Sequence, residues 1–336
     1  MKALSIIFQG PVGNNGLMSP EILQGLRKTL TNFPLAEIIV STWKHSEKVD
    51  RQRRRVLAMM GIRLVLSDDP GPLIGADDAG VYVTNLNRQL RSAQAGLAAA
   101  ARPLAVKLRT DTWLSSRALV PLLVRYVLEA EGPPRDSAFK VFSARVINAS
   151  GFARDARGSL PYLFHPGDIF LAGRTDDIRL FFSAPLADDS LFAPASMPGL
   201  WCAWRYVPEQ WFWVHAILAA TGQRVYPGNF QYTPATVAIS EQYFLANFVP
   251  FKARQIGLHW PKYWRKYPLR GMFSTMTPSR WLRLARQYGG ERCLSVHILP
   301  DRLLTILWRT GYRLRTRLLR NPCIRKAVIF LFLHRR

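Results

Sequence analysis

Residues 104–113 read LAVKLRTDTW, an apolar run that ends at a carboxylate. A short apolar run bounded by polar residues predicts a buried strand, and open α/β sheets bind ligands beyond the carboxyl ends of their strands. Asp111 would then lie at a ligand-binding edge beside Lys107 and Arg109. Carboxylate oxygens suit a divalent cation, whereas Lys and Arg suit phosphates. The stretch therefore indicates a site for a metal ion and a phosphorylated ligand, unless it is only a strand end followed by a turn aspartate.

The segments before this stretch alternate between predicted strands and helices. Strands are predicted over residues 4–8, 37–43 and 62–66, and the helix after the first strand begins at Ser19 and Pro20. A loop rich in Gly, Pro and Asn at residues 10–16 can bring backbone N–H groups close to a ligand. This alternation predicts an α/β fold with a mostly parallel, Rossmann-type central sheet flanked by helices.

A helix is predicted over residues 84–102, because apolar residues recur there at spacings of three and four. Its first turns carry Asn87, Arg88 and Gln89. Free N–H groups and polar side chains at a helix start favour an anion, so this end can face a pyrophosphate. The alternative interpretation is a solvated helix face.

The middle of the chain contains two candidate acid–base residues. Strands are predicted over residues 138–147 and 168–173, the second beginning at Asp168 just after a His-Pro-Gly turn. A helix begins at Pro208 and carries Glu209 in its first turn, among several aromatic residues. An aromatic, partly desolvated cleft raises the pKa of a carboxyl group and suits a general base. Alternatively, Glu209 only complements the helix dipole at the surface.

The net charge of +24 is concentrated near the C-terminus, where residues 251–336 hold 20 Lys and Arg against two acidic residues. Residues 302–320 predict a basic amphipathic helix with Trp308 on its apolar side. Such a helix is typical of binding to an anionic membrane surface. The alternatives are a helix packed on the core and nucleic-acid binding, which we do not expect because no recognised nucleic-acid module accompanies the charge.

Two further features restrict the class of protein. No run of about 18 apolar residues predicts a membrane-spanning helix. The three cysteines lack the spacing of a metal site or a disulfide framework, which favours a reducing compartment.

Six short motifs together resemble the WavE lipopolysaccharide-synthesis family across most of the first 260 residues. They are IIFQGP (6–11), IVSTW (39–43), NLNRQ (85–89) with Ser92 and Gly96, KLRTD (107–111), HPGD (165–168) through Arg174, and PEQW (208–211). The resemblance implies a glycosyltransferase with a GT-A-type nucleotide-sugar-binding fold that acts on bacterial lipopolysaccharide core.

The resemblance also implies roles for individual residues. The nucleotide-sugar donor would contact four groups of residues: the loop Gln9, Gly10 and Pro11; Ser41 and Thr42 with Asp68 or Asp69 at the base and ribose; Asn87, Arg88 and Gln89 at the pyrophosphate and sugar; and Lys107 with Arg109. Asp111 would take the place of the last carboxylate in the Asp-x-Asp motif that binds Mn²⁺ or Mg²⁺. Because Arg109 stands where the first Asp would be, Arg109 or Lys107 is an alternative source of positive charge for the diphosphate.

Together, these interpretations predict a glycosyltransferase that moves a sugar from a nucleotide-diphosphate donor to lipopolysaccharide core or a related lipid-linked glycan. If the transfer inverts the anomeric carbon, a base must take the proton of the acceptor hydroxyl, and Glu209 is the first choice for this base and Asp168 the second. The alternative is that both residues bind the acceptor by hydrogen bonds. The glycosyltransferase domain would comprise residues 1–260, and residues 261–336 would hold the protein on the cytoplasmic face of the inner membrane. The alternatives are a phosphotransferase on cell-surface sugars and a non-enzymatic basic protein that binds anionic lipid or nucleic acid.

Overall fold

A seven-stranded sheet runs through the described part of the chain, which comprises residues 2–13, 17–77, 80–193, 204–261, 273–290, 298–319, 321–324 and 327 of the computed structural model. The strand order is β10-β8-β9-β6-β1-β2-β3, and β9 alone of the seven runs against the others. The strands are β1 (Leu4–Gln9), β2 (Glu37–Trp43), β3 (Arg63–Ser67), β6 (Leu104–Arg109), β8 (Val146–Ala149), β9 (Phe170–Arg174) and β10 (Phe248–Phe251).

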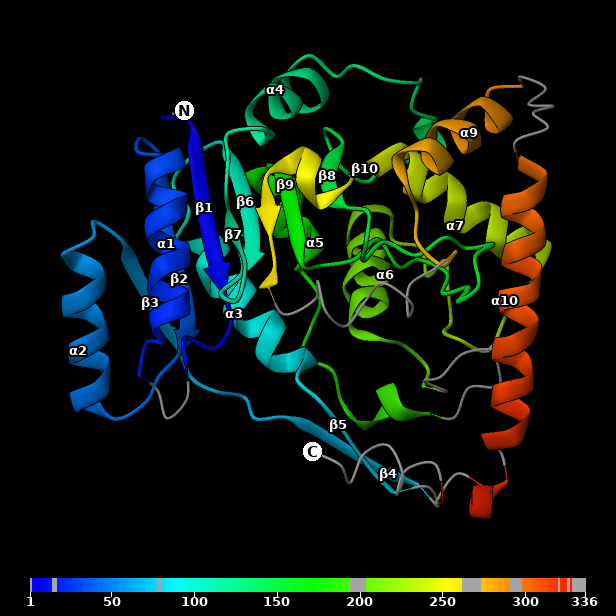
Figure 1. Ribbon diagram of the computed structural model, residues 1–336, viewed down its shortest axis with the longest axis horizontal. Coiled ribbons are helices and arrows are strands. Elements are labelled where there is room, and N and C mark those ends of the chain that lie inside the picture. Colours follow the sequence, from blue (N-terminus) through cyan, green and yellow to red (C-terminus); the bar gives the residue numbers. More distant parts are fainter. Residues whose placement is uncertain are drawn as a thin grey trace.

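Helices flank this sheet (Figure 1) and confirm the predicted α/β class with a mostly parallel central sheet. The predicted helix start at Ser19 is confirmed, because its Oγ accepts a hydrogen bond from the Ile22 N–H at 3.3 Å. The helices before the C-terminal region are α1 (Pro20–Asn32), α2 (Glu47–Ala58), α3 (Leu86–Ala98), α4 (Leu119–Leu123), α5 (Thr175–Phe181), α6 (Pro208–Thr221) and α7 (Pro234–Asn247).

Helix α3 lies against β1, β2 and β3, and Gly96 is the point of closest approach. A Cβ atom on Gly96 would lie 2.6 Å from Cγ2 of Ile7 and 2.9 Å from Cβ of Ser41. Glycine therefore sets the distance between this helix and the sheet. The polar start of α3 is consequently held at the carboxyl edge of β1 and β2.

The strand predicted over residues 138–147 is wrong for most of its length. Residues 137–139 form a 3-10 turn, and only Val146 and Ile147 enter β8. Side chains rather than a neighbouring strand satisfy the backbone between them. Asn247 Oδ1 accepts from two consecutive N–H groups, those of Val141 and Phe142, and the carboxylate of Asp177 accepts from the next two.

Two small antiparallel pairs lie outside the main sheet and were not predicted. The hairpin β4 (Leu73–Asp77) and β5 (Gly80–Thr84) connects β3 to α3 and extends to the lower edge of Figure 1. Strand β7 (Trp113–Leu114), which begins two residues after Asp111, pairs with β11 (Leu258–His259).

The C-terminal region contributes helix α9 (Pro278–Tyr288) and helix α10 (Ile298–Leu319), which contains most of the helix predicted over residues 302–320. Helix α9 belongs to the folded body, because Trp281 and Leu284 are buried and Arg280 forms an ion pair with the buried Asp155. Helix α10 stands at the side of the molecule in Figure 1. In the described part of the chain, every helix is too short or too polar to cross a bilayer.

Candidate functional site at the carboxyl edge of the sheet

Lys107 and Asp168 meet at the centre of the sheet edge, because β9 pairs antiparallel with β6. The register places Leu108 opposite Phe170, so the residues just before β9 lie beside the end of β6. The Lys107 Nζ donates to the Asp168 backbone oxygen at 2.6 Å and lies 3.4 Å from its Oδ2. Both side chains are buried, and burial lowers the pKa of the Lys107 amine while Asp168 partly offsets this.

Arg109 and Asp111 form a two-pronged ion pair at the end of β6. Arg109 Nε and Nη2 donate to the two carboxylate oxygens of Asp111 at 2.8 and 2.9 Å. The guanidinium also lies over the Trp260 ring, 5.3 Å from its centroid. Each side chain keeps about 30% of its surface exposed, so the pair borders solvent.

The turn that carries His165 and Asp168 is fixed by its neighbours. Asn148 Nδ2 in β8 donates to the Pro166 carbonyl at 2.6 Å, and the Arg154 N–H donates to the His165 carbonyl at 2.8 Å. Gly167 has a φ of +77° and packs against the backbone of residues 152–153, where a Cβ atom would lie 3.0 Å from a carbonyl carbon. Glycine is therefore required at this turn.

Glu209 lies in the first turn of α6, where Pro208 occupies the first helical position as predicted. Its carboxylate is 3.5 Å from Nε2 of His165, and 22% of its side chain is exposed. Burial raises the pKa of Glu209 to about 7, the nearby negative charge of Asp168 adds to this, and Arg154 and Lys107 partly oppose it. A carboxyl group with this pKa exchanges protons readily near neutral pH.

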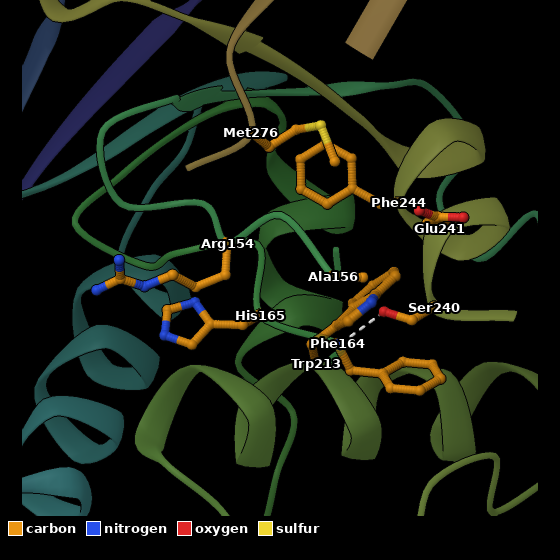
Figure 2. A pocket seen from close by; sticks show the side chains of 9 residues that line it. All are labelled: Arg154, Ala156, Phe164, His165, Trp213, Ser240, Glu241, Phe244 and Met276. Carbon is orange, nitrogen blue, oxygen red and sulfur yellow. Dashed lines mark hydrogen bonds between the residues drawn. The ribbon is translucent and has the colours of Figure 1, made fainter. Parts of the chain in front are cut away.

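His165 is the neutral neighbour of Glu209. Burial and the positive charge of Arg154 lower the pKa of His165 to about 3. Figure 2 shows its ring beside Arg154, at one end of a cavity of about 10 Å³ that reaches Glu241 on α7. Within the described part of the chain, the His165 Nδ1 is buried without a hydrogen-bond partner.

The predicted donor residues on β1 and β2 are mostly buried beneath the edge. Gln9 Nε2 donates to Ser92 Oγ at 2.8 Å, and Ser41 Oγ donates to the Ser92 carbonyl at 2.7 Å. Thr42 is also buried. In the loop after β1, Gly10 adopts a φ of +129°, and the Pro11 carbonyl oxygen accepts a hydrogen bond from Thr110 Oγ1 at 2.6 Å. Gln9 and Ser41 thus join α3 to β1 and β2, and Thr110 joins the end of β6 to the loop after β1.

The predicted residues near β3 and the start of α3 form a more exposed group. Arg88 donates to both carboxylate oxygens of Asp69 at 2.7 and 2.6 Å, and Asp68 pairs with Lys44 at 2.8 Å. Asn87, in contrast, is buried and exchanges two hydrogen bonds with the backbone of Ala187.

Three buried polar atoms in this region have no hydrogen-bond partner among the described residues. They are Trp43 Nε1, Ser67 Oγ and Gln89 Oε1. Buried polar atoms are normally paired with an atom of the protein, of water or of a ligand. These three atoms belong to the end of β2, the end of β3 and the first turn of α3.

The residues present do not fit the predicted Mn²⁺ or Mg²⁺ site at Asp111. Both oxygens of its carboxylate are engaged by Arg109, and the described residues contain no group of three His, Cys, Asp or Glu side chains arranged to hold a metal ion. Hard divalent cations prefer several oxygen ligands.

Two residues of this site were missed by the sequence interpretation, Arg154 and Trp260. Arg154 lies in a segment without regular secondary structure, and Trp260 follows β11. Neither has a local sequence pattern that distinguishes it from other arginines and tryptophans. Arg154 reaches the site through its backbone hydrogen bond to His165, and Trp260 through the pairing of β7 with β11.

The fold and the site together define an α/β protein with a cluster of charged and titratable side chains at the carboxyl edge of an open sheet, where ligands bind in proteins of this class. The chain belongs to the WavE lipopolysaccharide synthesis family, whose model matches residues 4–300. This confirms the family expected from the motifs. A comparison with curated protein sequences gives no match.

Several solved glycosyltransferase structures are remotely similar to this chain. The galactosyltransferase LgtC, in complex with donor and acceptor sugar analogues, is 11% identical with a TM-score of 0.37, and the match covers 88% of this chain and 99% of LgtC. An active-site mutant of LgtC is 12% identical with a TM-score of 0.30. This match covers 52% of this chain and 59% of LgtC, which is less than two thirds of that enzyme. Glucosyl-3-phosphoglycerate synthase from Mycobacterium tuberculosis, solved with Mn²⁺, UDP and glucosyl-3-phosphoglycerate, is 12% identical with a TM-score of 0.33. This match covers 73% of this chain and 78% of the synthase.

Proposed function

We propose that the protein is a glycosyltransferase that moves a sugar from a nucleotide-diphosphate donor to lipopolysaccharide core or a related lipid-linked cell-surface glycan. The observation that carries this proposal is Glu209, a partly exposed carboxyl group with a pKa of about 7 at the same sheet edge as Arg109 and Arg88. A proton acceptor and cationic side chains at one edge suit an inverting transfer of sugar from a diphosphate. Membership of a lipopolysaccharide-synthesis family supports the class of acceptor.

In the proposed reaction, the Glu209 carboxylate takes the proton of the acceptor hydroxyl. The hydroxyl oxygen then forms a bond to the anomeric carbon of the donor sugar. The bond from that carbon to the diphosphate oxygen breaks, and its electron pair leaves with the nucleoside diphosphate. Asp168, whose carboxyl group is buried beside Lys107, raises the affinity of Glu209 for this proton and is our second choice for the base.

Donor binding is proposed at the start of α3 and the ends of β2 and β3. Arg88 supports this placement, as do Trp43 Nε1, Ser67 Oγ and Gln89 Oε1, three buried atoms without a hydrogen-bond partner among the described residues. The proposed donor contacts are Gln9, Gly10, Pro11, Ser41, Thr42, Asp68, Asp69, Asn87, Arg88, Gln89, Lys107 and Arg109. Those with buried side chains would act mainly by shaping the backbone around the donor.

Replacing Glu209 by Gln tests the proposal. The change keeps the shape and removes the proton acceptor, so we expect kcat for nucleoside diphosphate release from the competent nucleotide sugar to fall about 10²–10⁴-fold. The KM for the donor should change little, because the donor is proposed to bind elsewhere on the edge. Glu47→Gln on the exposed face of α2 is the matched control and should leave kcat unchanged.

Two results would contradict the proposal. A protein that releases no nucleoside diphosphate from any nucleotide sugar, but transfers phosphate to a sugar, would be a phosphotransferase. If Glu209→Gln leaves the cellular glycan unchanged while charge reversal on α10 abolishes function, the protein acts by binding rather than by catalysis.

We further propose that α10 holds the protein on an anionic membrane surface, the cytoplasmic face of the inner membrane, where a lipid-linked acceptor lies. Trp308 and Arg309 face the folded body, where they contact the rings of Phe273 and Tyr232. The opposite side of the helix exposes a row of leucines, each about half or more exposed, namely Leu303, Leu307, Leu314 and Leu318.

This arrangement argues against α10 as a helix that buries its apolar stripe on the core. At 100° per residue, the exposed leucine row lies about opposite the side that contacts the body. The basic side chains of Arg313 and Arg317 flank the row and are also exposed. An exposed apolar row beside basic residues suits an interface between acyl chains and anionic headgroups.

A further inference from the structure

We propose that Arg109, held by Asp111, supplies the positive charge for the leaving diphosphate, in the place where related chemistry uses a divalent cation. This inference rests on the glycosyltransferase function proposed above and specifies how its donor site handles charge. It assigns Asp111 the role of a positioning residue for Arg109 rather than that of a metal ligand.

The geometry of the Arg109–Asp111 pair carries the inference. Arg109 Nε and Nη2 reach Asp111 Oδ1 and Oδ2 at 2.8 and 2.9 Å, which is the parallel two-bond arrangement of a strong arginine–carboxylate pair. A metal ion at these oxygens would share them with the guanidinium and would lie next to a second positive group. The repulsion between the two positive charges disfavours a metal ion at this place.

The same pattern extends along the whole carboxyl edge. Four aspartates there, in the described residues, each have a cationic partner: Asp68 has Lys44, Asp69 has Arg88, Asp111 has Arg109 and Asp168 has Lys107. A site that binds a divalent cation collects carboxylates whose charges the cation neutralises. Here each of the four carboxylates instead lies beside a cationic side chain of the protein.

Arg109 is also positioned for the anion. It is the last residue of β6, and the next residue, Thr110, is held by two hydrogen bonds. The Thr110 N–H donates to the Gln9 carbonyl at the end of β1, and its Oγ1 donates to the Pro11 carbonyl in the loop that follows. The Trp260 ring supports the guanidinium from one face. A planar arginine fork held in this way suits two oxygens of a diphosphate and binds them without losing much side-chain freedom.

Calorimetric titration of the full-length protein with UDP, GDP and inorganic pyrophosphate tests the inference, with either EDTA or Mn²⁺ present. We expect wild-type affinity for the binding probe to change less than twofold between the two conditions. Arg109→Gln should lower the affinity at least tenfold in both conditions. Arg109→Lys should lower it less, because lysine keeps the positive charge but not the paired N–H groups of the guanidinium. Asp111→Asn keeps a hydrogen-bond acceptor for Arg109 and should lower the affinity about threefold or less.

Arg51→Gln on the exposed face of α2 is the matched control and should bind like the wild type, and thermal unfolding checks that each variant is folded. Tenfold tighter binding with Mn²⁺ that Asp111→Asn abolishes would overturn the inference, as would unchanged binding in Arg109→Gln. If nucleotide-sugar turnover proceeds but requires Mn²⁺, the inference fails and the proposed function stands. If no probe binds and no nucleoside diphosphate is released under either condition, both fail.

Discussion

The pKa of Glu209 links the buried charges of the site to the pH range in which it can work. Burial beside Asp168 raises this pKa to about 7, against an ordinary value near 4.5. The carboxylate form, which accepts the proton, therefore predominates only above pH 7. A surface glutamate would be ionised throughout the same range.

The rate should therefore depend on pH near neutrality. We expect kcat/KM for the transfer reaction to fall about tenfold for each pH unit below 7, because the protonated Glu209 cannot act as a base. The measurement is a pH–rate profile between pH 5 and 9. A profile that stays flat down to pH 5 would assign the base role to a group with an ordinary pKa.

Stability gives a control that does not depend on activity. Since the pKa of Glu209 is higher in the folded state than in the unfolded state, the folded state binds more protons between about pH 4.5 and 7. Stability from this group is thus present below pH 4.5 and lost as the pH rises through 7. At pH 8 the neutral Glu209→Gln variant should be more stable than the wild type by about 3 kcal/mol, with no difference near pH 4.

At the scale of single elements, Gly96 shows how closely α3 must approach the sheet. A methyl group at this position would press on Ile7 and Ser41, both within 3 Å of the added carbon. Gly96→Ala should therefore destabilise the protein by about 1–3 kcal/mol despite the better helix propensity of alanine. Denaturant unfolding measures this change.

Gly311 on α10 is the matched control for this substitution. It is also a helical glycine, but nothing lies within 4 Å of an added carbon. Gly311→Ala should leave stability unchanged or raise it by up to about 1 kcal/mol. Equal effects at the two positions would show that packing at Gly96 is not the limiting contact.

The elements that the sequence predicted are those whose backbone follows a periodic apolar pattern. Strands β1, β2, β3 and β6, and helices α3 and α6, agree with the expectation to within a few residues. The segment at residues 140–145 was predicted as strand because its residue types suit one. Its hydrogen bonds go to the side chains of Asp177 and Asn247, which are 33 to 106 residues distant and are invisible to a local pattern.

The same limit applies to the site. Glu209, Asp168, Lys107 and Arg109 were recognisable because each stands at a predicted helix start or strand end. That Arg109 would turn to Asp111, two residues away, depends on side-chain directions that a sequence pattern does not give. That His165 would approach Glu209 depends on contacts between elements far apart in the chain. The assignments of the donor-contact residues remain predictions.

At the scale of the whole molecule, helix α10 presents both exposed leucines and exposed arginines. If α10 docks on a membrane, Leu307→Ser with Leu314→Ser should weaken binding to vesicles containing phosphatidylserine at least tenfold, because two exposed apolar side chains lose their burial in lipid. Thr310→Ser on the same helix is the control and should bind as the wild type. Vesicle co-sedimentation provides the measurement.

Charge should act separately from the leucine row. Arg313→Gln with Arg317→Gln should remove about 1 kcal/mol per residue near an anionic surface, and added salt should reduce the remaining difference. Binding that is unaffected by both pairs of substitutions would place the membrane contact elsewhere or remove it. The domain boundary predicted after residue 260 also stays a prediction, although α9 packs within the folded body.

The reversed strand β9 has a consequence for how the molecule comes into being. Lys107 meets Asp168 across 61 residues of chain, and Glu209 reaches His165 only once α6 has docked. Contacts between distant parts of a chain form late, because loop closure costs entropy before any contact rewards it. On a ribosome the first half of this protein would carry the arginines of the edge without their acid–base partners. The proposed activity would then be possible only after β9 and α6 have taken their places.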